Sequence, residues 1–285
     1  MSAKAGSGPG TVVLTGASSG IGRAAALALA NLGRSVVLVA RRKDALETLA
    51  KELKRRAPAT NPAVYVADLS LQREVRRLAS ELCSAYPKID VLINCAGIYF
   101  YRRGETPEGV ENTFALNVLA PLLLTELLRP SLKAAAPSRV IMVSSMAHAH
   151  QHLDFDDLEG RKQYRGFRYY GRSKLSLIYI THQLAEKYRA DRITVNSLHP
   201  GFIRSEFGRT NGGLVGAGMR FVELIAARSV EYGARTPVYL ATSPEVATIT
   251  GEYFVKCKPV RSSPESYDAE AEKRLWAECT KRLGI

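Results

Sequence analysis

The chain has 285 residues, of which 46% are apolar and 24% are charged, a composition typical of a soluble globular protein. It argues against a disordered or fibrous chain, and the length suits one large α/β domain or two small ones. Lysine and arginine outnumber acids 40 to 27, and the net charge of +13 allows nucleic acid, an anionic membrane or an anionic cofactor as partner. The basic residues are scattered rather than gathered into a tail or stripe, so we expect no nucleic acid, while peripheral membrane contact stays open.

Cysteine usage and the N-terminal residues bear on the compartment. The four cysteines lie far apart without a C-x-x-C pair, which favours a reducing environment over a disulfide framework or a zinc site. The first ten residues lack the apolar core of a signal peptide. No apolar run approaches the roughly 18 residues needed to span a bilayer. We therefore expect a cytoplasmic protein.

Short β-branched runs alternate with longer helical patterns along the chain. Strands are expected near residues 11–15, 35–40, 62–67, 89–94, 138–144, 192–198 and 251–256. Helices are expected at 20–33, 43–57, 71–86, 109–133, 171–190 and 231–243. Apolar runs such as 36–39 indicate strands buried on both faces, as in a parallel sheet covered by helices.

This alternation predicts a single doubly wound Rossmann-type α/β domain, with a mostly or wholly parallel sheet of about seven strands. The domain is expected over residues 11–258. A flexible tail, 1–10, precedes it, and a helical extension, 259–285, packs on the same domain. Segments 146–168 and 205–230 interrupt the alternation after strands, on the side where such folds bind ligands, and are candidate substrate loops.

A glycine-rich turn follows the first strand, with the sequence Thr15-Gly16-Ala17-Ser18-Ser19-Gly20-Ile21-Gly22. Glycine permits a tight turn and lets backbone N–H groups approach a pyrophosphate, and the following helix adds the partial positive charge of its N-terminus. The turn therefore predicts a dinucleotide phosphate site. A plain strand–helix turn is the alternative.

The end of the second strand indicates which dinucleotide is bound. The strand ends Ala40-Arg41-Arg42, without the acidic residue that would accept hydrogen bonds from the ribose 2′-hydroxyl of NAD. A guanidinium such as that of Arg41 can hold a 2′-phosphate by charge-assisted hydrogen bonds. This favours NADP(H) over NAD. Alternatively, both arginines only open a solvated helix.

Two tyrosines precede a lysine in Tyr169-Tyr170-Gly171-Arg172-Ser173-Lys174. Only Tyr170 has the lysine four residues on, on the same helical face, where the ammonium would lower the tyrosine pKa. Tyr170 could then protonate a carbonyl oxygen or deprotonate an alcohol. A serine at the end of the fifth strand, Ser145 or its neighbour Ser144, could hold the substrate oxygen against it.

Asn117 lies four residues before Pro121 in a helical pattern. Proline has no N–H, so the Asn117 carbonyl loses its partner in mid-helix and needs another, such as water. A helix kinked for packing alone is the alternative.

These motifs together resemble the short-chain dehydrogenase/reductase family. The glycine turn resembles its T-G-x-x-x-G-I-G signature, Asn94-Cys95-Ala96-Gly97 its N-x-A-G motif, and Pro200-Gly201-Phe202-Ile203-Arg204-Ser205 its P-G-x-V-x-T. The resemblance covers residues 11 to about 258. Ser145-Met146-Ala147-His148 and Tyr253-Phe254-Val255-Lys256-Cys257-Lys258 are most similar to the retinol dehydrogenase-like branch.

The resemblance implies roles for individual residues. Catalytic roles fall to Asn117 (through a relay water), Ser145, Tyr170 and Lys174. Cofactor contacts fall to Gly16, Ser18, Ser19, Gly20, Ile21, Gly22, Arg41, Asp68, Leu69, Asn94, Ala96, Gly97, Tyr170, Lys174, Pro200, Gly201, Ile203 and Ser205. Asp68 would contact adenine, with a helix-start cap as the alternative, and Ala40 stands where NAD-specific members carry Asp.

The resemblance also implies an activity. We expect an NADP(H)-dependent oxidoreductase that transfers hydride to or from an apolar substrate: a retinoid-like compound, long-chain aldehyde, steroid or other ketone. Family members commonly pair through helices like 109–133 and 171–190, so a homo-oligomer is possible. The alternatives are an isomerase or dehydratase on the same fold and a non-catalytic NADP(H)-binding regulator or scaffold. His148, His150 and His152 alternate as metal ligands could, but no acid or cysteine completes a site, and we expect no metal.

Overall fold

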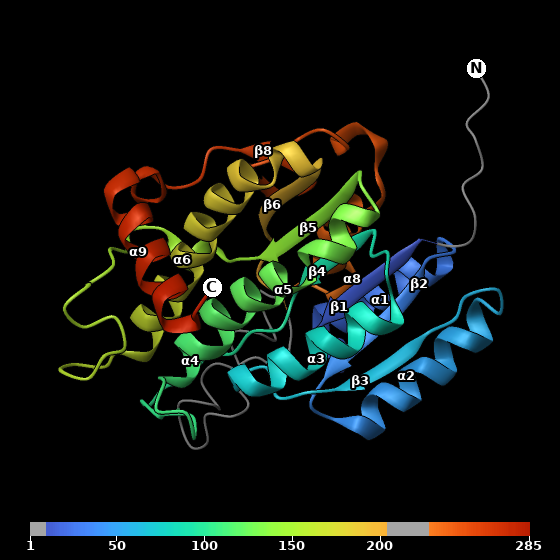
Figure 1. The fold of residues 1–285 in the computed structure, drawn as a ribbon, viewed down its shortest axis with the longest axis horizontal. Coiled ribbons are helices and arrows are strands. Elements are labelled where there is room, and N and C mark those ends of the chain that lie inside the picture. The colour runs from blue at the N-terminus through green and yellow to red at the C-terminus, as the bar shows by residue number, and fades with distance from the viewer. Residues whose placement is uncertain (1–9, 204–227) are drawn as a thin grey trace.

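The computed structural model describes residues 10–203 and 228–285, which form one central sheet flanked by helices (Figure 1). The strands are β1 (Thr11–Thr15), β2 (Ser35–Ala40), β3 (Ala63–Val66), β4 (Val91–Asn94), β5 (Ser138–Val143), β6 (Ile193–His199), β7 (Tyr253–Val255) and β8 (Lys258–Val260). The α-helices are α1 (Gly20–Asn31), α2 (Lys43–Arg56), α3 (Gln72–Ala85), α4 (Asn112–Phe114), α5 (Ala120–Ala134), α6 (Gly166–Lys187), α8 (Val230–Thr242) and α9 (Ala269–Leu283).

The strand order is β3-β2-β1-β4-β5-β6-β7-β8, and the first seven of these strands pair in parallel. The doubly wound prediction is therefore confirmed, with one strand more than expected. β8 adds an antiparallel edge through a tight turn at Lys256 and Cys257, whose φ angles are 52° and 62°. Positive φ at both central residues is the geometry of a two-residue hairpin. Neither residue is the glycine or asparagine that usually marks such a turn, so sequence reasoning missed it.

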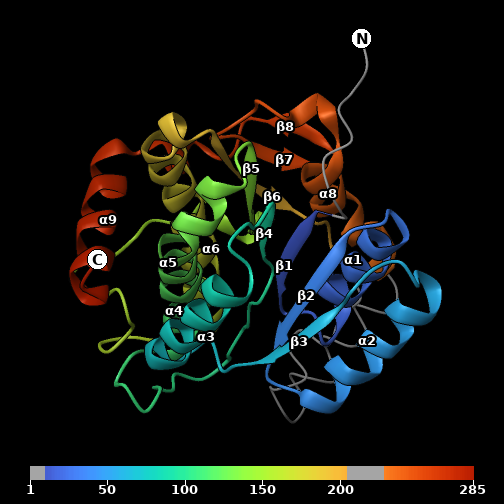
Figure 2. The same ribbon diagram turned by 45° about the vertical axis from the view of Figure 1, so that its right-hand side comes forward.

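Helices cover both faces of the sheet, as Figure 2 shows with the sheet between two layers. α1, α2 and α8 lie on one face over a core of aliphatic side chains such as Leu14 and Leu38. α3, α5 and α6 lie on the other, over a core that includes Val13 and Leu92. Because β-strand side chains alternate between faces, neighbouring residues of one strand feed the two separate cores.

Two helices differ from expectation in ways that matter for the site. α6 begins at Gly166 rather than near residue 171, so Tyr170 lies inside the helix. The helix expected at 109–133 is α4 and α5 joined by a π-helical turn, Ala115–Leu119. The joined stretch Asn112–Ala134 contains an 18-residue window with a mean hydropathy of 1.2, apolar enough to cross a membrane, but 72% of that window is buried inside the fold, as in a core helix.

The loop before α4 and the loop before α6 are tied together by buried carboxylates. Glu159 accepts a hydrogen bond from the backbone N–H of Glu111 at 2.8 Å and pairs with Arg282 of α9 at 2.6 Å. Glu111 in turn caps α4 through the N–H groups of Thr113 and Phe114. α9, which packs on α6, therefore also holds the loop 146–165 in place. Most of the other expected substrate loop, 205–230, lies outside the described residues.

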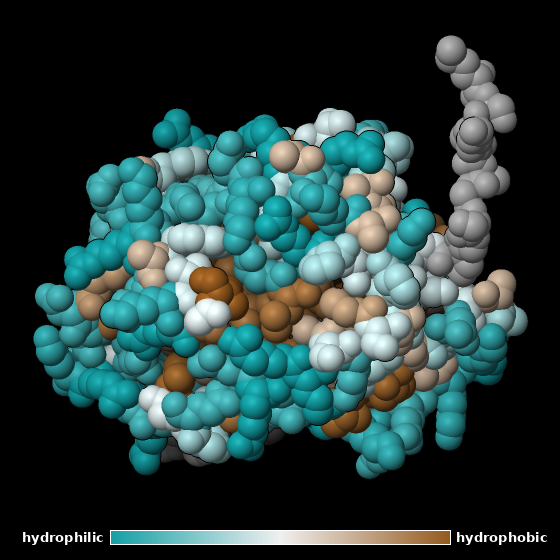
Figure 3. Space-filling view, in the orientation of Figure 1, coloured by the Kyte–Doolittle hydropathy of each residue, from teal (hydrophilic) through white to brown (hydrophobic). Residues whose placement is uncertain are grey.

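The face shown in Figure 3 is mostly hydrophilic, with apolar side chains gathered in a hollow near its centre, over α5. Half-buried apolar residues of α5 and its neighbours, Leu127 and Cys83 among them, pack against the core beneath.

Candidate active site

The glycine turn forms a backbone cradle at the carboxyl end of β1. Gly16 has a φ of +72°, and a Cβ there would lie 2.9 Å from the Cα of Ala96. A Cβ on Gly22 would collide with the carbonyl oxygen of Gly16. Neither position tolerates a side chain, because the start of α1, the turn and the loop after β4 touch through their backbones. Ser18, Ser19, Gly20 and Ile21 are half-buried at the N-terminus of α1, where N–H groups without helical partners can bind phosphate.

Thr15 joins the two motifs and was missed by sequence reasoning. Its hydroxyl accepts hydrogen bonds from the N–H groups of Cys95 at 3.0 Å and Ala96 at 3.1 Å. Asn94, expected as a cofactor contact, turns its side-chain amide into the core instead, where it donates to the hydroxyl of Thr125 at 3.1 Å. The side chain of Asn94 therefore fixes β4 against α5 and leaves the loop backbone to face a ligand.

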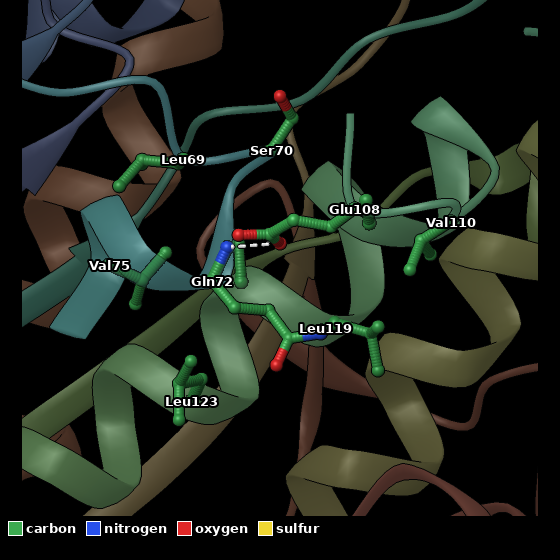
Figure 4. Close-up of a pocket in the computed structure, with 10 residues that line it drawn as sticks. Leu69, Ser70, Gln72, Val75, Glu108, Val110, Leu119 and Leu123 are labelled. Atoms are coloured by element: carbon green, nitrogen blue, oxygen red, sulfur yellow. Dashed lines mark hydrogen bonds between the residues drawn. The ribbon is translucent and has the colours of Figure 1, made fainter. Parts of the chain in front are cut away.

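The turn after β3 is held from two sides. One carboxylate oxygen of Asp68 accepts from the backbone N–H and the hydroxyl of Ser70, so it holds the turn before α3 rather than capping the helix, whose N-cap is Leu71. Glu108 points at the start of α3 and accepts from the N–H of Gln72 at 2.7 Å (Figure 4). Leu69 lines the recess drawn there, which leaves essentially no room for a water molecule.

The two arginines after β2 face different surroundings. Ala40 is buried at the end of the strand, and Arg41 is exposed. Arg42 donates from its guanidinium to the carbonyl oxygen of Ser18 in the phosphate turn, at 3.1 Å. The Arg42 guanidinium therefore lies beside the region in which Arg41 is expected to bind the 2′-phosphate.

Tyr170, Lys174 and Ser145 converge at the carboxyl edge of the sheet. Tyr170 is 9% exposed, and its phenol lies near the Ser145 side chain, which acts to lower the pKa of the phenol. The Lys174 ammonium lies 5.6 Å from the centre of the Tyr170 ring and donates to the carbonyl of Val143 at 3.0 Å. A Cβ on Gly97 would lie 3.2 Å from the same ammonium, so the loop after β4 reaches this group as well.

Burial dominates the electrostatics of this group. It raises the pKa of Tyr170 to about 12, against the lowering by hydrogen bonding to Ser145. It also lowers the pKa of Lys174 to about 8. We expected the lysine charge to lower the tyrosine pKa, and that expectation was wrong for this structure, because the ammonium lies beside the ring while both groups have lost their contact with water.

The neighbouring residues of the motif serve the fold. The hydroxyl of Ser144 donates to the carbonyl of Lys174 at 2.8 Å and is buried, so Ser145 is the serine that reaches Tyr170. Tyr169 points to the other side of α6, where its hydroxyl donates to the backbone carbonyl of Asp157 at 3.0 Å.

Asn117 lies fully buried within the π-helical turn, where its side chain is saturated. The amide oxygen accepts from the N–H of Ile98 at 2.9 Å, and the amide nitrogen donates to the carbonyl of Ile98 and to the hydroxyl of Ser173. The side chain thus ties the loop after β4 to α6, the helix that carries Tyr170 and Lys174. The turn is the local break in helical bonding expected from Pro121, and the water relay stays a prediction.

The described part of the segment after β6 packs against the starts of α1 and α8. Gly201 has a φ of +100°, which favours glycine, and follows Pro200. Ile203 is buried, and a Cβ on Gly233 of α8 would touch both Ile203 and Ile21. Ser205 lies outside the described residues.

Two further features of this region concern Tyr99 and the three alternating histidines. Tyr99, which no motif singled out, is buried with its ring 6.0 Å from the Tyr170 ring, edge to face. The three alternating histidines do not converge: His148 is buried, His150 and His152 are exposed, and the described residues contain no cluster of metal-ligating side chains.

The buried lysine makes a testable contribution to stability. Lowering its pKa from 10.5 to about 8 corresponds to as much as about 3 kcal/mol lost from the free energy of unfolding at neutral pH. We expect Lys174→Met to stabilise the fold by about 1–2 kcal/mol at pH 7, after about 1 kcal/mol for the lost hydrogen bond to Val143. Between pH 8 and 10.5 the unfolded wild type holds the proton that the native state has lost, so its stability rises with pH and the advantage of the variant shrinks.

Urea unfolding of both proteins at pH 7 and pH 9.5 measures this difference. A variant that is less stable than wild type at pH 7, or a difference in stability that is the same at the two pH values, would contradict it.

Comparison with known proteins adds sequence and structural relatives. A model of the short chain dehydrogenase family matches residues 10–212. Human retinol dehydrogenase 13 is 36% identical over 96% of this chain and 85% of its own length. DnrU of Streptomyces sp. (strain C5), provisionally named a daunorubicin C-13 ketoreductase, is 40% identical over 96% of this chain and 92% of its own.

Among solved structures, the Pseudomonas aeruginosa RhlG/NADP active-site complex matches with a TM-score of 0.69 and 26% identity, over 87% of this chain and 94% of that one. The family match covers most of the described sheet and includes the glycine turn, Ser145, Tyr170 and Lys174. This chain belongs to the short-chain dehydrogenase/reductase family of oxidoreductases, in its retinol dehydrogenase-like branch.

Proposed function

We propose that this oxidoreductase uses NADP(H) to reduce the carbonyl group, or oxidise the hydroxyl group, of an apolar substrate, with Tyr170 as general acid and base. The observation that carries the proposal is the buried contact of Tyr170 with Ser145, beside the Lys174 ammonium. A non-catalytic regulator on the same fold would need none of these three groups in contact.

The chain's own residues fit a nicotinamide dinucleotide. The close backbone packing at Gly16 and Gly22, where a Cβ would collide with Ala96 or with the Gly16 carbonyl oxygen, holds the turn at the N-terminus of α1, and the N–H groups there suit a pyrophosphate. When bound, the dinucleotide supplies or accepts the hydride. Lys174, at the Gly97 loop, is placed to donate to a ribose hydroxyl, and Pro200 and Gly201 border the same edge.

In the direction of reduction, the Ser145 hydroxyl holds the carbonyl oxygen and Tyr170 donates its proton to that oxygen. The raised pKa of Tyr170 keeps the phenol protonated and ready to donate. The Lys174 ammonium, 5.6 Å from the ring centre, is placed to offset part of the negative charge of the phenolate that remains, although burial keeps the net pKa of Tyr170 raised. In oxidation, the phenolate takes the proton of the alcohol.

An apolar substrate class is supported by the side chains around this edge. Tyr99 packs against Tyr170, and Met146 and Phe202, which follow β5 and β6, are 54% and 52% exposed. Apolar side chains exposed at the rim of a site can bury the body of a hydrophobic ligand. The names of the relatives, a retinol dehydrogenase and a ketoreductase, agree with this class.

The catalytic assignment is tested by a matched pair of tyrosine variants. Tyr170→Phe removes the transferable proton and should lower kcat by roughly 10²–10⁴-fold while NADPH binding persists. Tyr169→Phe should leave turnover near wild type and cost about 1 kcal/mol of stability, because it loses only the hydrogen bond to Asp157. A panel of apolar aldehydes, ketones and alcohols, assayed with NADPH and NADP⁺, gives the rates. If the wild-type protein binds NADPH but converts none of these compounds, the result would favour a non-catalytic regulator.

The cofactor preference is tested at the end of β2. Arg41 is exposed there, Arg42 borders the phosphate turn, and Ala40 offers no acid. A charge-assisted contact to the 2′-phosphate is worth roughly 1.5–3 kcal/mol, or about ten- to a hundredfold in affinity. We expect wild type to bind NADPH more tightly than NADH by that factor, and Ala40→Asp with Arg41→Ser to invert the order, since the acid repels the phosphate. Calorimetric titration measures both, and equal wild-type affinities would refute the NADP(H) assignment.

We further propose peripheral contact with an anionic membrane through the surface formed by Tyr101, Arg102, Arg165, Phe167 and Arg168. The backbone of Gly166 touches Phe100 and Tyr101, which brings the two loops together. Tyr101 and Phe167 are 51% and 64% exposed, and the three arginines make no ion pair within residues 10–203 and 228–285. Exposed aromatic rings flanked by arginine suit the headgroup region of an anionic bilayer, at about 1 kcal/mol per basic residue.

Sedimentation with vesicles tests this contact. We expect binding to phosphatidylcholine vesicles that contain phosphatidylserine, and binding weaker by about tenfold or more for Arg165→Glu with Arg168→Glu. Lys51→Glu with Arg55→Glu makes the same charge change on exposed positions of α2 and should have a much smaller effect. Equal losses in the two double variants would indicate net charge rather than this surface.

For a homo-oligomer, we propose pairing through α5. α9 covers part of α6, whereas an apolar hollow lies over α5 (Figure 3).

A further inference from the structure

His148 is a buried residue of the active-site region that the proposed chemistry does not use. It ends the short 3₁₀ turn Met146–His148 that directly follows Ser145, and it is 2% exposed. Its ring packs edge to face on Tyr253 of β7, with the ring centres 5.0 Å apart. A buried imidazole needs partners for both nitrogens, and both have them here.

The two partners determine which nitrogen carries the proton. Nδ1 lies 2.6 Å from the backbone carbonyl oxygen of Ser145, which can only accept. Nε2 lies 3.3 Å from the backbone nitrogen of Ser263, whose N–H can only donate. The imidazole must therefore be neutral with its proton on Nδ1. A protonated ring would direct its Nε2–H at the backbone N–H of Ser263. Burial lowers the pKa of His148 and therefore also favours the neutral ring.

The carbonyl that His148 binds belongs to the residue whose side chain meets the tyrosine. The Ser145 carbonyl receives both the ring N–H and the backbone N–H of His148. The Ser145 hydroxyl oxygen accepts from the N–H of Ala147 at 3.2 Å, which leaves the hydroxyl proton for Tyr170. Ser263, 115 residues further along the chain, anchors the other side of the ring.

We propose that His148 is a positioning residue: it clamps the backbone of Ser145 to the segment that carries Ser263, and so holds the Ser145 hydroxyl against Tyr170. This inference rests on the proposed function, because it assigns a task within that site. An error of about 1 Å in such a placement can cost roughly a hundredfold in rate. His199, Glu265 and Tyr253 are the titratable groups around the ring, and none of them replaces its bond to Ser145.

Two substitutions separate positioning from simple packing. His148→Phe keeps an aromatic ring but loses both hydrogen bonds, and kcat should fall by roughly ten- to a hundredfold with NADPH affinity unchanged. His148→Asn places an amide N–H near the position of Nδ1 and should recover most of that loss. His182→Phe, at a half-buried histidine on the outer part of α6, is the matched control and should leave kcat unchanged.

The pH dependence of turnover distinguishes the two roles, because a residue that only packs would not change the pKa of Tyr170. Hydrogen bonding to Ser145 lowers the pKa of Tyr170, so a displaced Ser145 should raise it. The rising limb of alcohol oxidation, which requires the phenolate, should therefore shift to higher pH in His148→Phe and return in His148→Asn. Unshifted profiles, or equal losses in the two variants, would overturn the proposal.

An independent measurement needs no turnover. ¹⁵N NMR of the imidazole rings, with the His148 signals identified by their absence in His148→Phe, should show the neutral Nδ1–H form at pH 7. An Nε2–H or doubly protonated ring would overturn the clamp even in an active enzyme. Absence of turnover in wild type, with the Nδ1–H form present, would instead contradict the proposed function.

Discussion

The Thr15 hydroxyl is the contact on which the rest of the site depends. By accepting from two backbone N–H groups after β4, it locks the phosphate turn to the neighbouring loop. The backbones then touch, which leaves no space for a Cβ on Gly16. The same loop continues to Gly97, against which the Lys174 ammonium lies, and to Ile98, which Asn117 binds on both sides. The glycine turn and the region around Tyr170 and Lys174, for which we propose cofactor binding and acid–base chemistry, are thus joined through one connected backbone structure.

A second consequence is that the two groups proposed for catalysis lower the stability of the fold. Tyr170 and Lys174 are held away from water, and burial works against the charged form of each. The fold tolerates this cost because large apolar cores lie on both faces of the sheet. Buried, strained or desolvated groups of this kind are common where a protein performs chemistry rather than mere packing.

Much of the fold was predictable from local patterns. Every expected strand exists within about two residues, because a parallel strand buried on both faces reads as a short β-branched run. The turn before α1 and the approach of Lys174 to Tyr170 on α6 were predictable because their spacing alone has physical meaning: a tight turn before a helix, and one helical face. The prediction failed at β8, whose turn uses two residues with ordinary side chains at positive φ, and at the start of α6, where no capping side chain marks the boundary.

The sequence by itself determined the alternation of strands and helices, the phosphate turn and the pairing of tyrosine with lysine, since each depends on residues within a few positions of one another. Only the tertiary structure decided which of two adjacent serines meets Tyr170, that the Asn94 side chain faces the core, and that Arg42 borders the phosphate turn. It alone brought Ser263 to His148. Such contacts depend on how distant segments pack, and no local or periodic pattern in the sequence encodes that packing.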